Sequence, residues 1–162
     1  CDGIICHAFS TERYLKEVTL PAVQRGLDKS GRSLDSFEIV GPGFVVTGGD
    51  EKAIDNSATA IRQQIAFYAS TPAYRPVLEL HGWGDAQDEL NRMSKEGAWQ
   101  EMGTLINDEM LETFAVVGEP EKIAPGVLER YGSDVDRMAF YSLGSNGDSS
   151  MWDQIASDLL AG

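Results

Sequence analysis

The sequence predicts an α/β fold, in which helices cover a mainly parallel sheet. Short apolar segments alternate with segments of helical periodicity along the 162 residues. The run Phe44-Val45-Val46 is apolar at consecutive positions, as expected for a parallel strand that is covered on both faces. After Asp50, apolar residues recur at spacings of four, three and four, which is typical of an amphipathic helix: Ile54, Ala58, Ile61 and Ile65. With no internal repeats, one domain over residues 1–162 is expected.

The first half of the chain predicts strand, helix, strand and helix in that order. Residues 3–7 form an apolar strand, and residues 12–29 form a helix that Gly31 ends. Pro21 marks either a kink or a new first turn in this helix. Residues 37–47 form the clearest strand. Gly41-Pro42-Gly43 interrupts it, because proline cannot donate a hydrogen bond to a neighbouring strand.

The second half contains a segment that is too long for an ordinary strand-to-helix connection. Residues 70–101 are rich in aromatic and turn residues and predict a helical insertion. Apolar residues from Met102 to Phe114 predict one further helix. Another helix starts at Pro120, and Pro125-Gly126 in its second turn should break it. Residues 135–141 predict a third strand and residues 152–160 a closing helix.

Composition excludes several classes of function. The chain is 42% hydrophobic and 24% charged, as in folded globular proteins, and its formal net charge is −13. A nucleic-acid binder or a protein that docks on anionic membranes would need a basic face. No segment approaches the ~20 apolar residues of a membrane span. The two cysteines, Cys1 and Cys6, lie on opposite faces of a predicted strand and have no spacing for a metal site. Free thiols favour a cytoplasmic location.

Several motifs together resemble the luciferase-like monooxygenases, the flavin and deazaflavin oxidoreductases related to bacterial luciferase. The resemblance is to the C-terminal half of these proteins and, most closely, to the branch of coenzyme F-420-dependent oxidoreductases. It covers nearly the whole chain. The motifs are residues 1–10 (CDGIICHAFS), 62–68 (RQQIAFY), 71–74 (TPAY), 79–83 (ELHGW) and 116–121 (VVGEPE). Glu119 departs from the Thr or Asp that the family prefers at that position.

The resemblance implies the C-terminal portion of a (β/α)8 TIM barrel with a helical insertion at about residues 70–101. It implies an oxidoreductase that transfers a hydride or activates oxygen on a small organic substrate. The cofactor would be the deazaflavin coenzyme F-420, with FMN as the alternative, and part of the cleft would come from a missing N-terminal half. The alternative is a non-catalytic half-barrel that associates with a partner through open sheet edges. A homo-oligomer is also compatible, and the sequence leaves the substrate open.

Barrel enzymes carry their sites at the carboxyl ends of the strands, which here are the loops after His7, Thr47 and Tyr141. His7 stands where related alkanesulfonate monooxygenases have an active-site aromatic residue. It is the catalytic candidate, because a neutral imidazole can donate a proton or bind a substrate oxygen. The alternative is a histidine that only bonds a backbone carbonyl. Gly41 and Gly43 replace an Arg and a His of those enzymes and would either admit a cofactor ring or simply form a bulge.

Two further groups of candidates remain. Thr47 and Ser142 lie in loops with small hydrogen-bond donors that suit a cofactor phosphate. The loop after Thr47 leads to Asp50, and capping of the following helix is the better interpretation of that loop. Residues 142–147 either bind a phosphate or form a link after the last predicted strand. The insertion supplies aromatic and polar side chains for a substrate lid, or for packing against the barrel: Tyr74, Arg75, His81 and Trp83.

Overall fold

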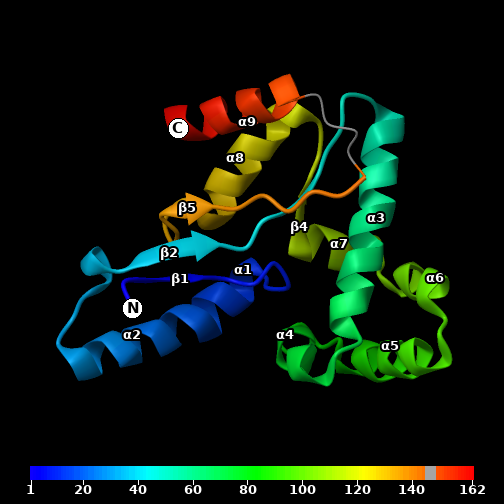
Figure 1. The fold of residues 1–162 in the computed structure, drawn as a ribbon, viewed down its shortest axis with the longest axis horizontal. Helices are drawn as coiled ribbons and strands as arrows, with labels where there is room; N and C mark the ends of the chain where they lie inside the picture. The colour runs from blue at the N-terminus through cyan, green and yellow to red at the C-terminus, as the bar shows by residue number, and fades with distance from the viewer. Residues whose placement is uncertain (145–148) are drawn as a thin grey trace.

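The computed structural model describes residues 1–144 and 149–162 and contains two small parallel sheets (Figure 1). The first sheet has the order β1-β2-β5, and the second pairs β3 with β4. The strands are β1 (Gly3–Ile5), β2 (Glu38–Gly41), β3 (Phe44–Val46), β4 (Ala115–Val117) and β5 (Arg137–Met138). Every strand pair in the described part of the chain is parallel, which confirms the α/β prediction. Closure of these strands into a barrel stays a prediction.

Helices surround these strands. They are α1 (Glu12–Tyr14), α2 (Leu20–Ser30), α3 (Glu51–Ala69), α4 (Arg75–Glu79), α5 (Gly84–Glu96), α6 (Trp99–Met102), α7 (Asp108–Phe114), α8 (Pro120–Tyr131) and α9 (Ser149–Ala161). Figure 1 shows α2 along one side of β1 and β2, with α8 and α9 on the other side. The long α3 stands beyond the end of β2, together with the short helices α4, α5 and α6. Among the described residues, no helix is long and apolar enough to cross a membrane.

The strands β2 and β3 follow one another and are interrupted at Pro42-Gly43, as the sequence predicts, and together they form a central ribbon. Along one edge of this ribbon, the Ile39 carbonyl accepts a hydrogen bond from the N–H of Asp136, the residue before β5. On the same edge, the Val45 N–H donates to the Tyr141 carbonyl. Along the other edge, the Val40 carbonyl accepts a hydrogen bond from the N–H of Cys6, just after β1. The Val46 carbonyl accepts one from the N–H of Gly118, just after β4. The central ribbon therefore joins both sheets and brings the ends of several distant segments together.

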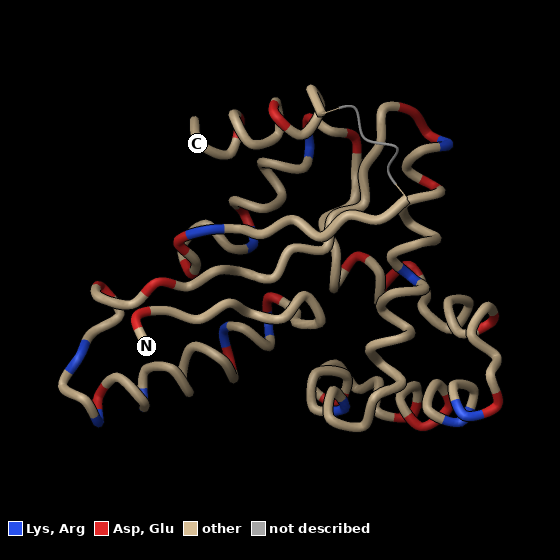
Figure 2. The backbone as a smooth tube through the Cα atoms, viewed as in Figure 1, with Lys and Arg blue, Asp and Glu red and all other residues tan. Residues whose placement is uncertain are grey.

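Neighbouring residues of β3 point into two different hydrophobic cores, because this strand is covered on both faces. Phe44 packs in the core formed with α3, α4, α5 and α7, whereas Val45 packs in the core formed with α8 and α9. Phe44 is 2% exposed and Val45 is completely buried. Acidic side chains are spread over the helices rather than gathered on one face (Figure 2). The negative charge is thus mostly a solvated surface.

The expected break of the helix after Pro120 is wrong. Helix α8 runs from Pro120 to Tyr131 with Pro125 inside it. Proline removes only one backbone hydrogen bond, and α8 buries an apolar face that offsets this loss: Ile123, Ala124, Val127 and Tyr131. Gly126 allows the helix to approach β4, since a Cβ there would lie 2.8 Å from Val116 Cγ1.

The single helix expected from Met102 to Phe114 is also wrong. The chain turns after α6, and a new helix, α7, begins at Asp108. Asn107 caps it by accepting a 2.8 Å hydrogen bond from the Met110 N–H. Strand β4 follows α7 directly. The sequence analysis did not predict this strand, because its residues show no alternation of apolar and polar side chains. Between α3 and α6 the segment contains short helices, as the sequence predicts.

Candidate active site at the carboxyl ends of the strands

A cavity of about 360 Å³ lies where β1, β2 and β5 end. Its volume falls in the range of small-molecule sites. Residues of the three strand ends and one residue of α3 line it: Ile5, Cys6, His7, Ala8, Gly41, Gly43, Tyr68, Ala139, Phe140 and Tyr141. The structure therefore brings together three of the predicted site residues, which are His7, Gly41 and Gly43.

The imidazole of His7 is oriented by the chain that follows it. The Phe9 N–H donates to His7 Nδ1 at 3.0 Å. Because Nδ1 accepts this bond, the neutral ring carries its proton on Nε2, which lies 3.4 Å from the Tyr74 hydroxyl. The ring stacks on Tyr74 with centroids 5.1 Å apart and meets the edge of Tyr68 at 4.8 Å. His7 itself is exposed, so its Nε2 is accessible to a ligand.

Two tyrosine hydroxyls lie at the same cavity. The side chain of Tyr68 on α3 lies near that of Tyr141, which follows β5, and near Gln64 one turn earlier on α3. Burial raises the pKa of Tyr68, and the contact with Tyr141 raises this pKa further. Tyr68 is therefore a phenol at neutral pH and can donate a hydrogen bond. The Tyr141 ring packs edge-on against Phe44, with centroids 5.2 Å apart.

Gly41 and Gly43 are explained by close packing inside the sheet. A Cβ on Gly41 would lie 2.6 Å from Met138 Sδ, and a Cβ on Gly43 would collide with the carbonyl of Ala139. Larger residues at these positions would push β5 away from the central ribbon. Both glycines also line the cavity, so they present backbone rather than charged side chains to it. Approach of a cofactor ring to this backbone stays a prediction.

Two loops were predicted to bind a cofactor phosphate. The loop at Thr47 lies apart from the cavity, and the loop at Ser142 lies beside it. Thr47 does not line the cavity; it is completely buried, and its hydroxyl has no hydrogen-bond partner within the described residues. Asp50 caps α3 by accepting a 2.7 Å bond from the Ala53 N–H, which confirms the capping interpretation. Ser142 is half-buried and directly follows Tyr141. The rest of that loop, residues 145–147, lies outside the described residues.

Of the lid candidates, only Tyr74 lies beside His7. Arg75 forms an ion pair with Glu79 at 2.6 Å within α4, and a second with Asp88 at 2.7 Å that joins α4 to α5. These two carboxylates raise the pKa of Arg75. Arg75 is thus engaged within the helical segment rather than directed at the cavity.

His81 fastens this helical segment to the loop after β1. Its Nε2 lies 2.8 Å from the hydroxyl of Thr11, and its ring stacks on Trp83 with centroids 4.8 Å apart. Nearby, the Arg13 guanidinium donates to the Leu80 carbonyl at 2.7 Å. Thr11 is completely buried and also accepts a bond from the N–H of Tyr14. His81 and Trp83 do not line the cavity, but they hold the segment that carries Tyr74.

The His81 contact makes stability depend on pH. Burial lowers the pKa of His81 from its ordinary 6.5, and the positive charge of Arg13 lowers this pKa further. As the pH falls, His81 is therefore protonated at a higher pH in the unfolded chain than in the folded chain. The stability from neutral His81 is complete above about pH 6.5 and is lost as the pH falls through the lowered pKa.

We expect His81→Gln to make the free energy of unfolding less sensitive to pH between about pH 7 and about pH 5. Glutamine keeps a polar partner for Thr11 but does not titrate in this range. Urea denaturation at several pH values measures the difference between the two proteins. Parallel pH dependences in wild type and variant would contradict the assignment.

Cys6 lies next to His7 and lines the cavity, but its chemistry differs from that of a nucleophile. Burial raises the pKa of the Cys6 thiol, so the reactive thiolate is disfavoured at neutral pH. Cys6 is half-buried and packs against the core near α8 and α9. Among the described residues, no cluster of histidine, cysteine and carboxylate side chains could hold a metal ion.

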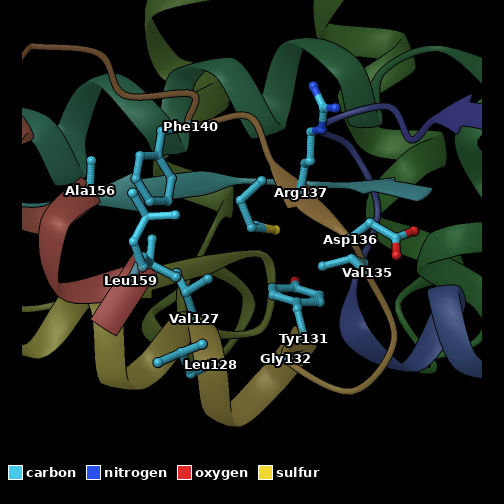
Figure 3. Close-up of a pocket in the computed structure, with 12 residues that line it drawn as sticks. Val127, Leu128, Tyr131, Gly132, Val135, Asp136, Arg137, Phe140, Ala156 and Leu159 are labelled. Atoms are coloured by element: carbon cyan, nitrogen blue, oxygen red, sulfur yellow. The ribbon is translucent and has the colours of Figure 1, made fainter. Parts of the chain in front are cut away.

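A second cavity, of about 470 Å³, lies between α8, α9 and β5 and has a different character (Figure 3). Its wall is largely apolar and includes Val127, Phe140 and Leu159. Figure 3 shows Arg137 directed away from this apolar cluster. Asp136 is already occupied, since it accepts a 2.7 Å bond from the Ile39 N–H. Without convergent polar groups, this cavity is a gap in helix packing rather than a reaction site.

Tyr68 and Tyr141 are the site residues that the sequence analysis missed. Tyr141 stands at the end of the last predicted strand, and its position at a carboxyl end is a signal that could have identified it. Tyr68 offered no such signal. It lies near the end of a long helix and reaches the cavity only because α3 crosses the strand ends.

The chain is similar to known proteins over most of its length. Residues 1–137 match the profile of the luciferase-like monooxygenase family. An uncharacterized protein of Mycobacterium tuberculosis is 51% identical over 137 residues, which are 85% of this chain and 40% of that protein. A 5,10-methylenetetrahydromethanopterin reductase of Archaeoglobus fulgidus is 28% identical over 134 residues, or 79% of this chain and 38% of the reductase.

The fold also matches a solved structure. The coenzyme F-420-dependent tetrahydromethanopterin reductase of Methanopyrus kandleri superimposes with a TM-score of 0.76 at 20% identity, over 99% of this chain and 45% of that enzyme. The chain belongs to the luciferase-like monooxygenase family. It spans less than half the length of these relatives.

Proposed function

We propose that this chain is the part of a coenzyme F-420-dependent oxidoreductase that positions a proton donor beside the reacting ring. Family membership and the F-420-dependent relatives support an oxidoreductase of this type. The observation that carries the proposal is the His7 geometry. Its Nδ1 is held by the Phe9 N–H, and its protonated Nε2 lies at a cavity formed by the carboxyl ends of the strands.

The residues of the cavity fit the ring portion of such a cofactor. Its described lining contains no Lys, Arg, Asp or Glu, and it combines glycine backbone with the faces of aromatic side chains. An uncharged planar ring suits these walls. Gly41, Gly43 and Tyr68 would contact the ring, which supplies hydride transfer when bound. The lining offers no cation for a phosphate, so the charged tail of the cofactor would be bound outside this cavity.

In this proposal His7 acts on the substrate. Nε2–H donates a hydrogen bond or a proton to the substrate atom that gains negative charge. Tyr74 stacks on the imidazole and keeps its plane, while the Tyr68 hydroxyl is a further donor at the same cavity. The segment fastened by His81 carries Tyr74 and so holds its ring against the imidazole of His7.

A cofactor titration of the full-length protein tests the proposal. We expect coenzyme F-420 to bind saturably, with quenching of its fluorescence, and to bind more tightly than FMN. Tighter binding of FMN would replace the deazaflavin by a flavin in the same class of enzyme. Absence of binding by both cofactors would refute the proposal.

One observation favours a second function. Ile5 is 77% exposed at the end of β1, where the outer edge of the strand has no partner in the described residues. A non-catalytic half-barrel would use such an edge to pair with another chain. A full-length protein that binds neither cofactor but forms a stable complex through β1 would support this alternative.

A further inference from the structure

A groove of about 540 Å³ runs along the exposed flank of α3, next to the candidate active site. Three segments that are distant in the sequence form it: α3, α6 and the chain after Tyr141. Its lining is Ala60, Gln63, Gln64, Phe67, Trp99, Gln100, Met102 and Leu143. The α3 residues recur at helical spacing and so share one face. No sequence motif indicated this groove.

Contacts between α3 and α6 hold the two walls of the groove together. The Gln63 amide donates to the Trp99 carbonyl, and Gly103 permits the approach, since a Cβ there would lie 2.5 Å from Gln63 Oε1. This contact places the Trp99 ring 6.1 Å from that of Phe67, centroid to centroid, at an angle of 45°. Phe67 is 50% exposed and Trp99 is 45% exposed, so both rings offer a face to a ligand.

The lining of the groove is uncharged, as is that of the active-site cavity. The chain has 26 acidic and 13 basic residues, yet none of the described residues that line the groove is charged. Two half-exposed aromatic faces are accompanied by three glutamine amides, which can both donate and accept hydrogen bonds. Such walls favour a neutral planar ring with a polar edge, and the surrounding negative charge disfavours an anion.

The groove and the active-site cavity lie on neighbouring parts of α3 and of the chain after β5. Gln64 lines the groove, and Tyr68, one turn further along α3, lines the cavity. The rings of Phe67 and Tyr68 are 5.6 Å apart, centroid to centroid. On the opposite wall, Leu143 of the groove follows Tyr141 of the cavity by two residues.

We propose that this groove binds a neutral, planar aromatic part of the substrate, while the reacting part lies beside His7. Phe67 and Trp99 are specificity-determining residues that stack on the ring, and the glutamine amides bind its polar edge. The identity of the ligand as substrate rests on the proposed function. The presence of a binding site for this chemistry does not.

Equilibrium dialysis of the full-length protein tests the proposal with two probes. Quinazolinone is a neutral planar bicyclic amide, and naphthoate is a planar anion of similar size. We expect quinazolinone to bind saturably and naphthoate to bind at least about tenfold more weakly, because the groove lacks a cation. Trp99→Ala and Phe67→Ala should each weaken quinazolinone binding at least about tenfold, as for loss of a stacking side chain. Trp99→Phe should restore most of it.

Matched controls separate stacking from general destabilisation. Leu105→Ala removes an exposed apolar side chain near the groove that does not line it, and Trp152→Phe alters a tryptophan that contacts Phe140 instead. Both should bind quinazolinone as wild type does. Thermal unfolding of each variant confirms that it is folded.

Three results would overturn the proposal. They are equal binding of quinazolinone by wild type and Trp99→Ala, absence of quinazolinone binding by wild type, and a change of oligomeric state as the only effect of the groove variants. The last result would identify the groove as an interface between copies. Coenzyme F-420 titrated into the wild type keeps the two hypotheses apart. If only coenzyme F-420 fails to bind, the proposed function is refuted. If only quinazolinone fails to bind, the proposed binding site in the groove is refuted.

Discussion

His7→Ala in the full-length protein is expected to lower kcat/KM for coenzyme F-420-dependent turnover by about 10²- to 10⁴-fold, the usual contribution of a positioned proton donor. The variant removes the Nε2–H at the strand ends but leaves the surrounding chain in place, because His7 is exposed. The absorbance change of coenzyme F-420 with its substrate measures the rate. Binding of the cofactor, followed by fluorescence, should change much less than the rate.

Tyr74→Phe is the matched control for this experiment. It keeps the ring that stacks on His7 and removes only the hydroxyl that lies 3.4 Å from Nε2. If Tyr74 only orients the imidazole, this variant should lose less activity than His7→Ala. Equal activity of His7→Ala and wild type would exclude His7 as a catalytic residue.

Phe44→Ala is expected to lower the free energy of unfolding by about 3–5 kcal/mol, the usual cost of truncating a buried phenylalanine. Phe44 lies in β3 with 2% of its surface exposed and packs against the rings of Tyr68 and Tyr141. Its removal leaves a space directly behind the candidate site. Urea denaturation of the full-length protein measures the loss.

Phe67→Ala serves as the comparison, because Phe67 is also on an element of this core but is 50% exposed. Its truncation should cost less than about 1 kcal/mol, since most of the side chain remains in contact with water. Similar losses from both substitutions would mean that β3 does not form the centre of the core. A loss of cofactor binding in Phe44→Ala without unfolding would show that the core also orients Tyr68 and Tyr141.

Local sequence signals predicted several elements because their causes are local. The apolar run of β3, the interruption of the strand at Pro42 and the cap of α3 at Asp50 each depend on residues within a few positions of one another. The same local reasoning failed for α8. There Pro125 indicated a break, and burial of the helix against β4 and α9 overrode it.

By itself, the sequence determined the α/β class, the family and the placement of His7, Gly41 and Gly43 at the ends of strands. Each of these depends on patterns along the chain. Only the tertiary structure showed that Tyr68 of α3 and Tyr141 meet at the same cavity, that Arg75 joins α4 to α5, and that His81 holds the helical segment to the loop after β1. These contacts join residues that are separated by many turns of chain. Their geometry is decided by how helices pack across the sheet, which no local pattern records.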